Sequence, residues 1–133
     1  MPMTDFLEAK ILNMVLNSIP YVEPDDMWIG LFTVSPSDTG GGTEVPTGGG
    51  TLYGRVQVTA DFSTDDLDTR FSNDSSIDFP TAGIDWNDIV AVGFFDAETA
   101  GNLLLYEDLA VTRNVDAGDT FSFVADALGV TLD

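Results

Sequence analysis

The residues of this 133-residue chain that could do chemistry are almost all carboxylates. It has 23 Asp and Glu against four Lys and Arg, with no histidine and no cysteine. The chain therefore cannot build a Ser-His-Asp triad, a cysteine nucleophile or a thiolate zinc site. Paired carboxylates could act as the acid and nucleophile of a glycosidase, but such sites need an aromatic-lined cleft and more loop mass than we expect here. We predict no enzymatic activity.

Two other chemical patterns are incomplete. The triple glycines at residues 40–42 and 48–50 are similar to a phosphate-binding loop. That loop also needs a Lys followed by Ser or Thr and then a helix, whereas a strand is expected here. Asp65, Asp66 and Asp68 lack the alternating oxygen ligands, central glycine and distant glutamate of a calcium loop, so we expect a solvated acidic turn. We predict no metal and no cofactor.

The formal net charge of −19 restricts the possible partners. Nucleic acid and anionic membranes are excluded, because each contact would add repulsion instead of releasing counterions. The acids are spread along the chain, which we interpret as adaptation to a saline setting, with a specific cationic partner as the alternative. No stretch approaches the roughly 20 apolar residues of a membrane span. Asp5 and Glu8 stand where a signal peptide would carry positive charge, so none is expected.

Residues 4–19 carry apolar side chains with a helical period. Thr4 suits the N-cap position, and Pro20 stops the helix because it lacks a backbone donor and disfavours a helical Ile19. We expect this helix to pack on the sheet of its own domain, and docking on another chain is the alternative. The broad apolar face comprises Leu7, Ile11, Leu12, Met14, Val15, Leu16 and Ile19.

From residue 27 onward the period changes to two, which indicates strands. Residues 27–33 and 89–96 are apolar on both faces and predict interior strands. Both contain an aliphatic residue and a glycine followed by an apolar residue and Phe, so we expect them to pair, with Gly30 and Gly93 allowing close packing beneath aromatic neighbours. Residues 52–62 alternate: Val56, Val58 and Ala60 are expected on a buried face, and Tyr53, Arg55, Gln57 and Thr59 on a wet face.

Shorter strands are expected near residues 77–79, 103–111 and 120–125. One helix followed by about six to eight strands at roughly ten-residue spacing is typical of a β-sandwich or related barrel. The sequence therefore predicts a mainly β fold: an antiparallel β-sandwich or barrel-like domain with one N-terminal amphipathic helix. We expect a single domain over residues 1–133, with the β domain at 27–133.

A glycine-rich loop, residues 35–50, interrupts the strand pattern. It is longer than ordinary connections, which suggests a functional arm or a mobile flap. We expect its central part, here called the contact arm, to be exposed and to touch a partner. The contact arm comprises Asp38, Thr39, Gly40, Gly41, Gly42, Thr43, Glu44, Val45, Pro46 and Thr47.

Segments spread over nearly the whole chain resemble a family of small bacteriophage structural proteins, often labelled tail-fibre-like, some of which resemble capsid decoration or cement proteins. The most specific segments are GLFTVSPSDTGGGTEV at residues 30–45 and FFDAETAGNLL at residues 94–104. The resemblance implies a non-enzymatic virion component that forms a homo-oligomer. For a decoration protein it implies trimers on the local threefold junctions of the capsid. Because this chain is so acidic, a basic contact surface in relatives cannot be carried over to it.

Two functions follow from the resemblance. The first, which we favour, is a capsid decoration or cement protein on the outside of the phage head. Its partners would be the major capsid protein and its own copies, and it would be assembled in the host cytoplasm. The alternative is a tail-fibre or receptor-binding module that recognises a host surface glycan. A fibre protein usually needs a long shaft or a trimerising coiled region, and the sequence contains neither, so we favour the capsid.

Overall fold

The computed structural model describes residues 1–64 and 70–132, so the acidic turn expected at Asp65, Asp66 and Asp68 lies outside the described residues. One helix precedes a series of strands that range from two to thirteen residues. The elements are α1 (Asp5–Asn17), β1 (Trp28–Val34), β2 (Thr43–Glu44), β3 (Val56–Gln57), β4 (Phe62–Thr64), β5 (Phe71–Asn73), β6 (Ile77–Asp78), β7 (Asn87–Phe95), β8 (Leu103–Val115), β9 (Ser122–Phe123) and β10 (Gly129–Val130).

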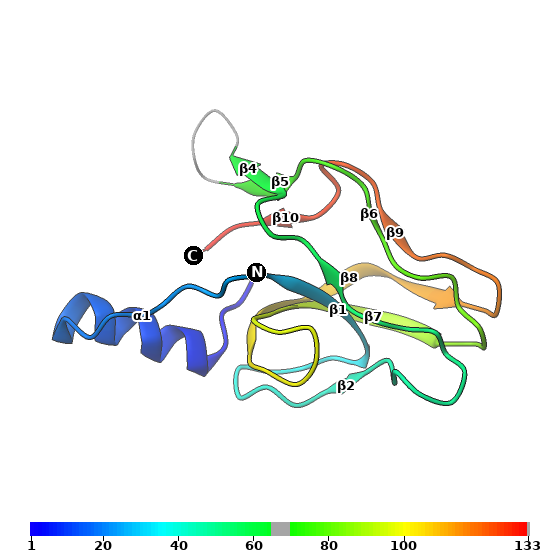
Figure 1. Ribbon diagram of the computed structural model, residues 1–133, viewed down its shortest axis with the longest axis horizontal. Helices are drawn as coiled ribbons and strands as arrows, with labels where there is room; N and C mark the ends of the chain where they lie inside the picture. The colour runs from blue at the N-terminus through cyan, green and yellow to red at the C-terminus, as the bar shows by residue number, and fades with distance from the viewer. Residues whose placement is uncertain (65–69, 133) are drawn as a thin grey trace.

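The strands form two layers (Figure 1). The larger sheet has the order β2-β1-β7-β8, with β3 also paired to β1, and the second layer contains the small sheets β10-β5-β4 and β6-β9. Every pair of named strands is antiparallel. The fold is mainly β and sandwich-like instead of a closed barrel, which confirms the predicted fold class and decides between its two variants.

Strands β1 and β7 are the central pair of the larger sheet. Trp28 to Phe32 pair with Phe95 to Ala91, and Gly30 lies directly opposite Gly93. A Cβ added at Gly30 would approach the Phe95 ring to 2.9 Å, and one added at Gly93 would approach the Phe32 ring to 2.8 Å. Both the predicted pairing and the close packing beneath aromatic rings are confirmed.

The main core fills the space between the two layers. The face of β1 that carries Ile29 and Leu31 is fully buried there, together with Phe79, which follows β6 of the opposite layer, and Trp86, which precedes β7. On the other face of the sheet, Phe32, Ala91 and Phe95 form a second, smaller cluster that is partly covered by Trp28, Val90 and Leu103. Because both faces of β1 are buried, the prediction of an interior strand is confirmed.

The prediction of one long strand at residues 52–62 is wrong. Within it only Val56 and Gln57 form β3, and β4 begins at Phe62. Tyr53 and Arg55, which were expected on the wet face, are mostly buried, whereas Ala60 is exposed. The alternation failed because Tyr53 and Arg55 find hydrogen-bond partners inside the protein, which makes burial of polar side chains favourable.

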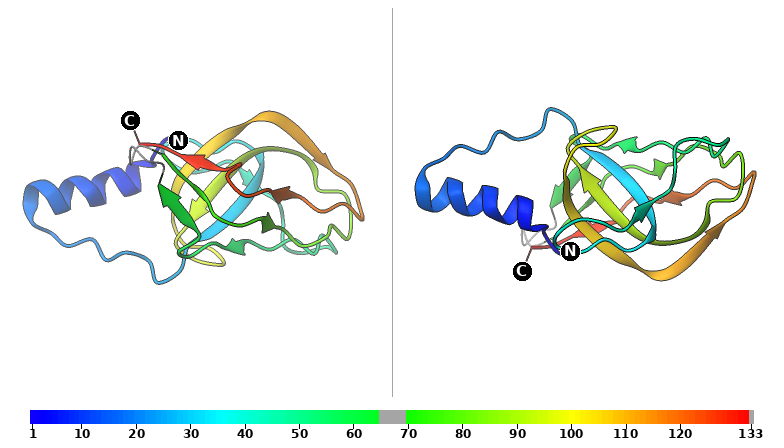
Figure 2. Two further views of the ribbon diagram at one scale, coloured as in Figure 1. Left: turned by 90° about the horizontal axis from the view of Figure 1, so that it is seen from above. Right: turned by 90° about the horizontal axis from the view of Figure 1, so that it is seen from below.

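Helix α1 begins and ends close to its predicted limits. The Thr4 hydroxyl accepts a hydrogen bond from the backbone N–H of Leu7, and Ser18 adopts a left-handed conformation that ends the helix before Pro20. No residue of α1 is buried, and the helix points away from the sheets (Figures 1 and 2). The expectation that it packs on its own sheet is therefore wrong. Among the described helices, none is long and apolar enough to cross a membrane.

The close packing at Gly30 predicts a sharp stability loss for Gly30→Ala. The new methyl group would lie 2.7 Å from a Glu44 carboxylate oxygen and 2.9 Å from the Phe95 ring. Overpacking of this kind costs about 1–3 kcal/mol, and we expect a loss of about that size in urea unfolding. The matched control is Gly48→Ala, because an added Cβ there meets no atom within 4 Å. An equal effect of the two substitutions would contradict the packing argument.

Candidate functional site

The contact arm folds back onto the body of the protein instead of extending from it. Thr43 and Glu44 form β2 and pair with Val34 and Phe32 of β1, and Val45 is only 2% exposed. The expectation of an exposed arm is therefore wrong at Val45, which buries its apolar side chain in the main core, and in part at Glu44, which is half-buried. Other arm residues are exposed at the surface: Asp38, Thr39, Gly41, Gly42, Thr43, Pro46 and Thr47. That the arm contacts a partner stays a prediction.

A tight turn begins the contact arm. The backbone groups of Ser37 and Gly40 exchange two hydrogen bonds of 2.9 and 2.8 Å. Gly42 then approaches the main chain of β1 so closely that a Cβ would lie 2.6 Å from the Val34 carbonyl oxygen, and its φ of +73° disfavours side chains. These glycines are needed for a compact turn, and no helix follows to form a phosphate site.

Glu44 and Arg55 form an ion pair beside this turn. The guanidinium Nε and Nη2 donate to the two carboxylate oxygens of Glu44 at 2.9 and 2.8 Å, and the exposed fractions of the side chains are 7% for Arg55 and 23% for Glu44. Such two-point pairing fixes the orientation of both groups and is stronger than a neutral hydrogen bond. The pair therefore holds β2 against residue 55 in a defined geometry.

The remaining donor group of Arg55 extends the same network. Nη1 donates to the carbonyl oxygens of Ala97 and Ala100, each at 2.8 Å, and the guanidinium lies 3.4 Å from the centre of the Phe95 ring. A cation over an aromatic face is attracted to it electrostatically. One side chain thus connects β2, the end of β7 and the turn of residues 97–100.

Tyr53 completes the network from the core side. Its hydroxyl donates to Glu44 at 2.7 Å and accepts from the backbone N–H of Leu31 at 2.9 Å. Burial raises the pKa of the Tyr53 phenol well above its ordinary value, and the nearby Glu44 carboxylate raises it further. The phenol is therefore protonated at neutral pH and serves as a fixed donor. It is a structural group with no acid–base role.

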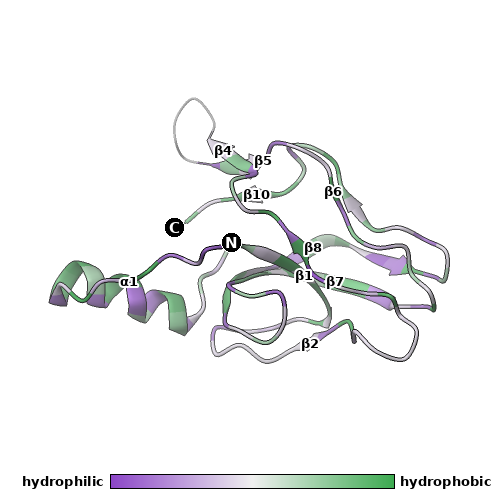
Figure 3. Cartoon of the chain, viewed as in Figure 1, coloured by the Kyte–Doolittle hydropathy of each residue, from purple (hydrophilic) through white to green (hydrophobic). Residues whose placement is uncertain are grey.

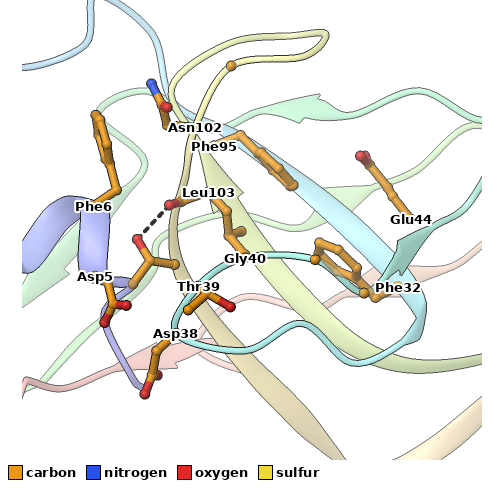
Figure 4. Close-up of a pocket in the computed structure, with 14 residues that line it drawn as sticks. Asp5, Phe6, Phe32, Asp38, Thr39, Gly40, Glu44, Phe95, Asn102 and Leu103 are labelled. Carbon is orange, nitrogen blue, oxygen red and sulfur yellow. Dashed lines mark hydrogen bonds between the residues drawn. The ribbon is translucent and has the colours of Figure 1, made fainter.

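A pocket of about 440 Å³ opens where the start of α1, the turn of the contact arm and the start of β8 meet (Figure 4). Phe32 and Phe95, both almost buried, contribute apolar surface to it. The polar side chains that line it are those of Thr4, Asp5, Asp38, Thr39, Glu44 and Asn102. The tertiary structure therefore brings the first half of the contact arm together with residues that are far away in the sequence.

Asp38 joins the contact arm to both α1 and β8. Its carbonyl oxygen accepts the backbone N–H of Asp5 at 2.8 Å, and its carboxylate accepts the hydroxyl of Tyr106. This hydrogen bond, together with partial burial and the negative charges of Asp38, Asp108 and Asp5, raises the pKa of Tyr106 to about 12. The first half of the arm is therefore held against the body of the protein at this point.

The pocket offers mainly hydrogen-bond acceptors. Carboxylate and amide oxygens at the pocket accept hydrogen bonds, which suits a ligand rich in hydroxyl or amine donors. Within residues 1–64 and 70–132, no group of three or more acidic side chains could hold a metal ion. Sequence reasoning did not predict the roles of Tyr53, Arg55 and Asp38. The one feature of the sequence that could have indicated the role of Arg55 is the rarity of arginine in so acidic a chain.

Comparison with known protein families gives a match over nearly the whole chain. The profile of the family Gp80, described as Podophage GP4 fiber I protein gp80, matches residues 2–131. The match includes α1, the contact arm and every strand from β1 to β10. A search of curated proteins finds no match.

The ion pair predicts that Arg55→Lys destabilises the protein although the positive charge is kept. A lysine cannot make the two-point bond to Glu44 and also reach two carbonyl oxygens, so buried acceptors lose partners. We expect a loss of about 2 kcal/mol in urea unfolding. The control is Arg113→Lys, because Arg113 is exposed on β8. An exposed charge contributes at most about 1 kcal/mol, so equal losses would refute the special role of Arg55.

The contact between Asp38 and Tyr106 predicts an alkaline transition that can be measured by tyrosinate absorbance at 295 nm. Because the pKa of Tyr106 is raised by folding, the contact stabilises the protein fully at pH values below the ordinary pKa of 10.0. This stabilisation is lost as the pH rises through the folded-state pKa of about 12. Asp38→Asn should move the Tyr106 transition down toward its ordinary value. Tyr106→Phe identifies the transition by removing it. No shift in the Asn variant would show that Asp38 does not bind Tyr106 in solution.

Proposed function

We propose that this chain, which belongs to the Podophage GP4 fiber I protein gp80 family, is a non-enzymatic component of the virion fibre. A structural role in the phage virion follows from the family itself. The location in a fibre is supported by the match over residues 2–131 to a family described as a fibre protein. This description favours a tail-fibre or receptor-binding module over a capsid decoration protein.

The sequence contains no long shaft, which favoured the capsid over a fibre. The family described as a fibre protein nevertheless matches residues 2–131, so its description applies to the β-sandwich with one projecting helix and requires no appended shaft. A domain of this kind suits a module at the base or the tip of a fibre. The net charge of −19 is compatible with either place on the virion surface.

A host surface glycan is the ligand that we propose for this module, and the pocket of Figure 4 is the proposed site. Sugar hydroxyls are good donors to the carboxylates and amide that surround the pocket, namely Asp5, Asp38 and Asn102. The half-buried ring of Phe6 adds an apolar surface beside them. The absence of histidine and cysteine from the chain supports binding without catalysis.

The location can be tested on purified virions. We expect quantitative mass spectrometry to find few copies of this chain relative to the major capsid protein, and gold-labelled antibodies to mark the tail. A fibre serves a few attachment points, whereas a decoration protein repeats over the entire shell. Copy numbers in the hundreds with label over the head would overturn the fibre proposal in favour of capsid decoration.

Recognition is tested separately in phage that carry Thr39→Trp. Thr39 is exposed at the pocket, so the indole should fill it and reduce adsorption to host cells without removing the protein from virions. Thr47→Trp is the matched control, because Thr47 is an exposed part of the contact arm that does not line the pocket. Normal adsorption of both variants would exclude the pocket while leaving the fibre location standing.

A further inference from the structure

The outer half of α1 and the residues that follow it form an apolar surface that the protein itself leaves uncovered. Figure 3 shows apolar residues along the helix where it extends beyond the sheets. The backbone contacts of α1 with the rest of the chain are at its beginning, near Thr4 and Asp5. We call this surface the helix patch; its side chains and exposed fractions are Leu12 56%, Met14 44%, Val15 67%, Leu16 72%, Ile19 54% and Val22 80%.

The helix patch is also free of charge. Residues 11–22 contain no Asp, Glu, Lys or Arg, in a chain with 23 acidic residues. Two like-charged molecules repel each other wherever their acidic surfaces meet, and this repulsion acts over a Debye length of about 8 Å at physiological salt. A copy of this chain can therefore approach another most easily through residues 11–22.

We propose that the helix patch binds the same patch of a second copy, with the two helices antiparallel around a twofold axis. In this arrangement Val15 of each copy lies near the axis and packs against its equivalent, and Leu12 of one copy packs near Ile19 of the other. The acidic residues Asp5 and Glu8 stay outside the contact. The proposal does not depend on whether the protein lies in a fibre or on the head.

The antiparallel direction follows from the charge of the two bodies. A thirteen-residue helix is about 20 Å long, so antiparallel helices place the two β-sandwiches at opposite ends, separated by more than the Debye length. Parallel helices would instead bring bodies of net charge −19 side by side. The charge thus favours a pair over the trimer implied by the family resemblance.

The size of the helix patch fits a small, reversible contact. Its exposed fractions correspond to roughly 600 Å² per copy in total, and the side chains on the face with Leu12, Val15 and Leu16 account for about half of this, well below the roughly 800 Å² that each partner buries in a standard interface. The contact core would be entirely apolar, which is typical of interfaces between identical chains. A patch of this size lies at the upper end of the roughly 300–600 Å² that the largest apolar patch of a monomeric protein covers, and such patches are often functional.

The first test compares two substitutions of equal charge by analytical ultracentrifugation of the full chain. The wild type is expected to dimerise, and Val15→Glu to weaken the association at least about tenfold, since it buries a charge in an apolar contact. Val111→Glu should leave association unchanged, because Val111 is 60% exposed on β8, outside the helix patch. A wild type that stays monomeric, or equal weakening by both substitutions, would overturn the proposal.

The second test uses the absence of cysteine to determine the direction of the helices. Val15→Cys lies near the proposed axis and should form an intermolecular disulfide under mild oxidation. Glu8→Cys should not, because two such positions would lie roughly 20 Å apart in an antiparallel pair, beyond the roughly 7 Å limit for bridged Cα atoms. Equally fast bridging at both positions would show parallel helices and would overturn the antiparallel arrangement.

Discussion

The ion pair of Glu44 and Arg55 is the interaction on which most of the surrounding structure depends. It connects β2 to the segment before β3, and Arg55 also binds two carbonyl oxygens of the turn after β7 and covers the Phe95 ring. Removing either partner would leave a mostly buried charge unpaired, and such a loss is far more costly than that of an exposed ion pair. The pair therefore holds β2, which lies between the two triple glycines, beside the sheet.

The molecule separates two tasks between two regions. The β-sandwich places its large apolar side chains in one core between the layers and a smaller one outside them, and it forms the pocket where the contact arm meets α1 and β8. The helix contributes nothing to either core and presents its apolar side chains to the outside. In the functions that we propose, the body recognises a ligand and α1 contacts another chain.

The membership in a fibre family agrees with this division and gives the acidic composition a physical meaning. Charge of one sign disfavours side-by-side association of copies, and in the dimer that we propose the copies meet through the uncharged residues 11–22. Repulsion between the acidic surfaces of two copies gives specificity, because it disfavours contacts outside residues 11–22 without strengthening the contact through them.

The sequence by itself determined the β class, the helix, its N-cap Thr4, its end before Pro20, and the pairing of β1 with β7, because apolar periodicity, capping residues and the two glycines are local signals. The burial of Tyr53 and Arg55, the docking of Val45 in the core and the isolation of α1 were decided only by the tertiary structure. Local alternation counted Tyr53 and Arg55 as polar and therefore exposed. Their burial depends on Glu44, a partner about ten residues away, and on carbonyl oxygens more than forty residues away, and no periodic pattern records such contacts.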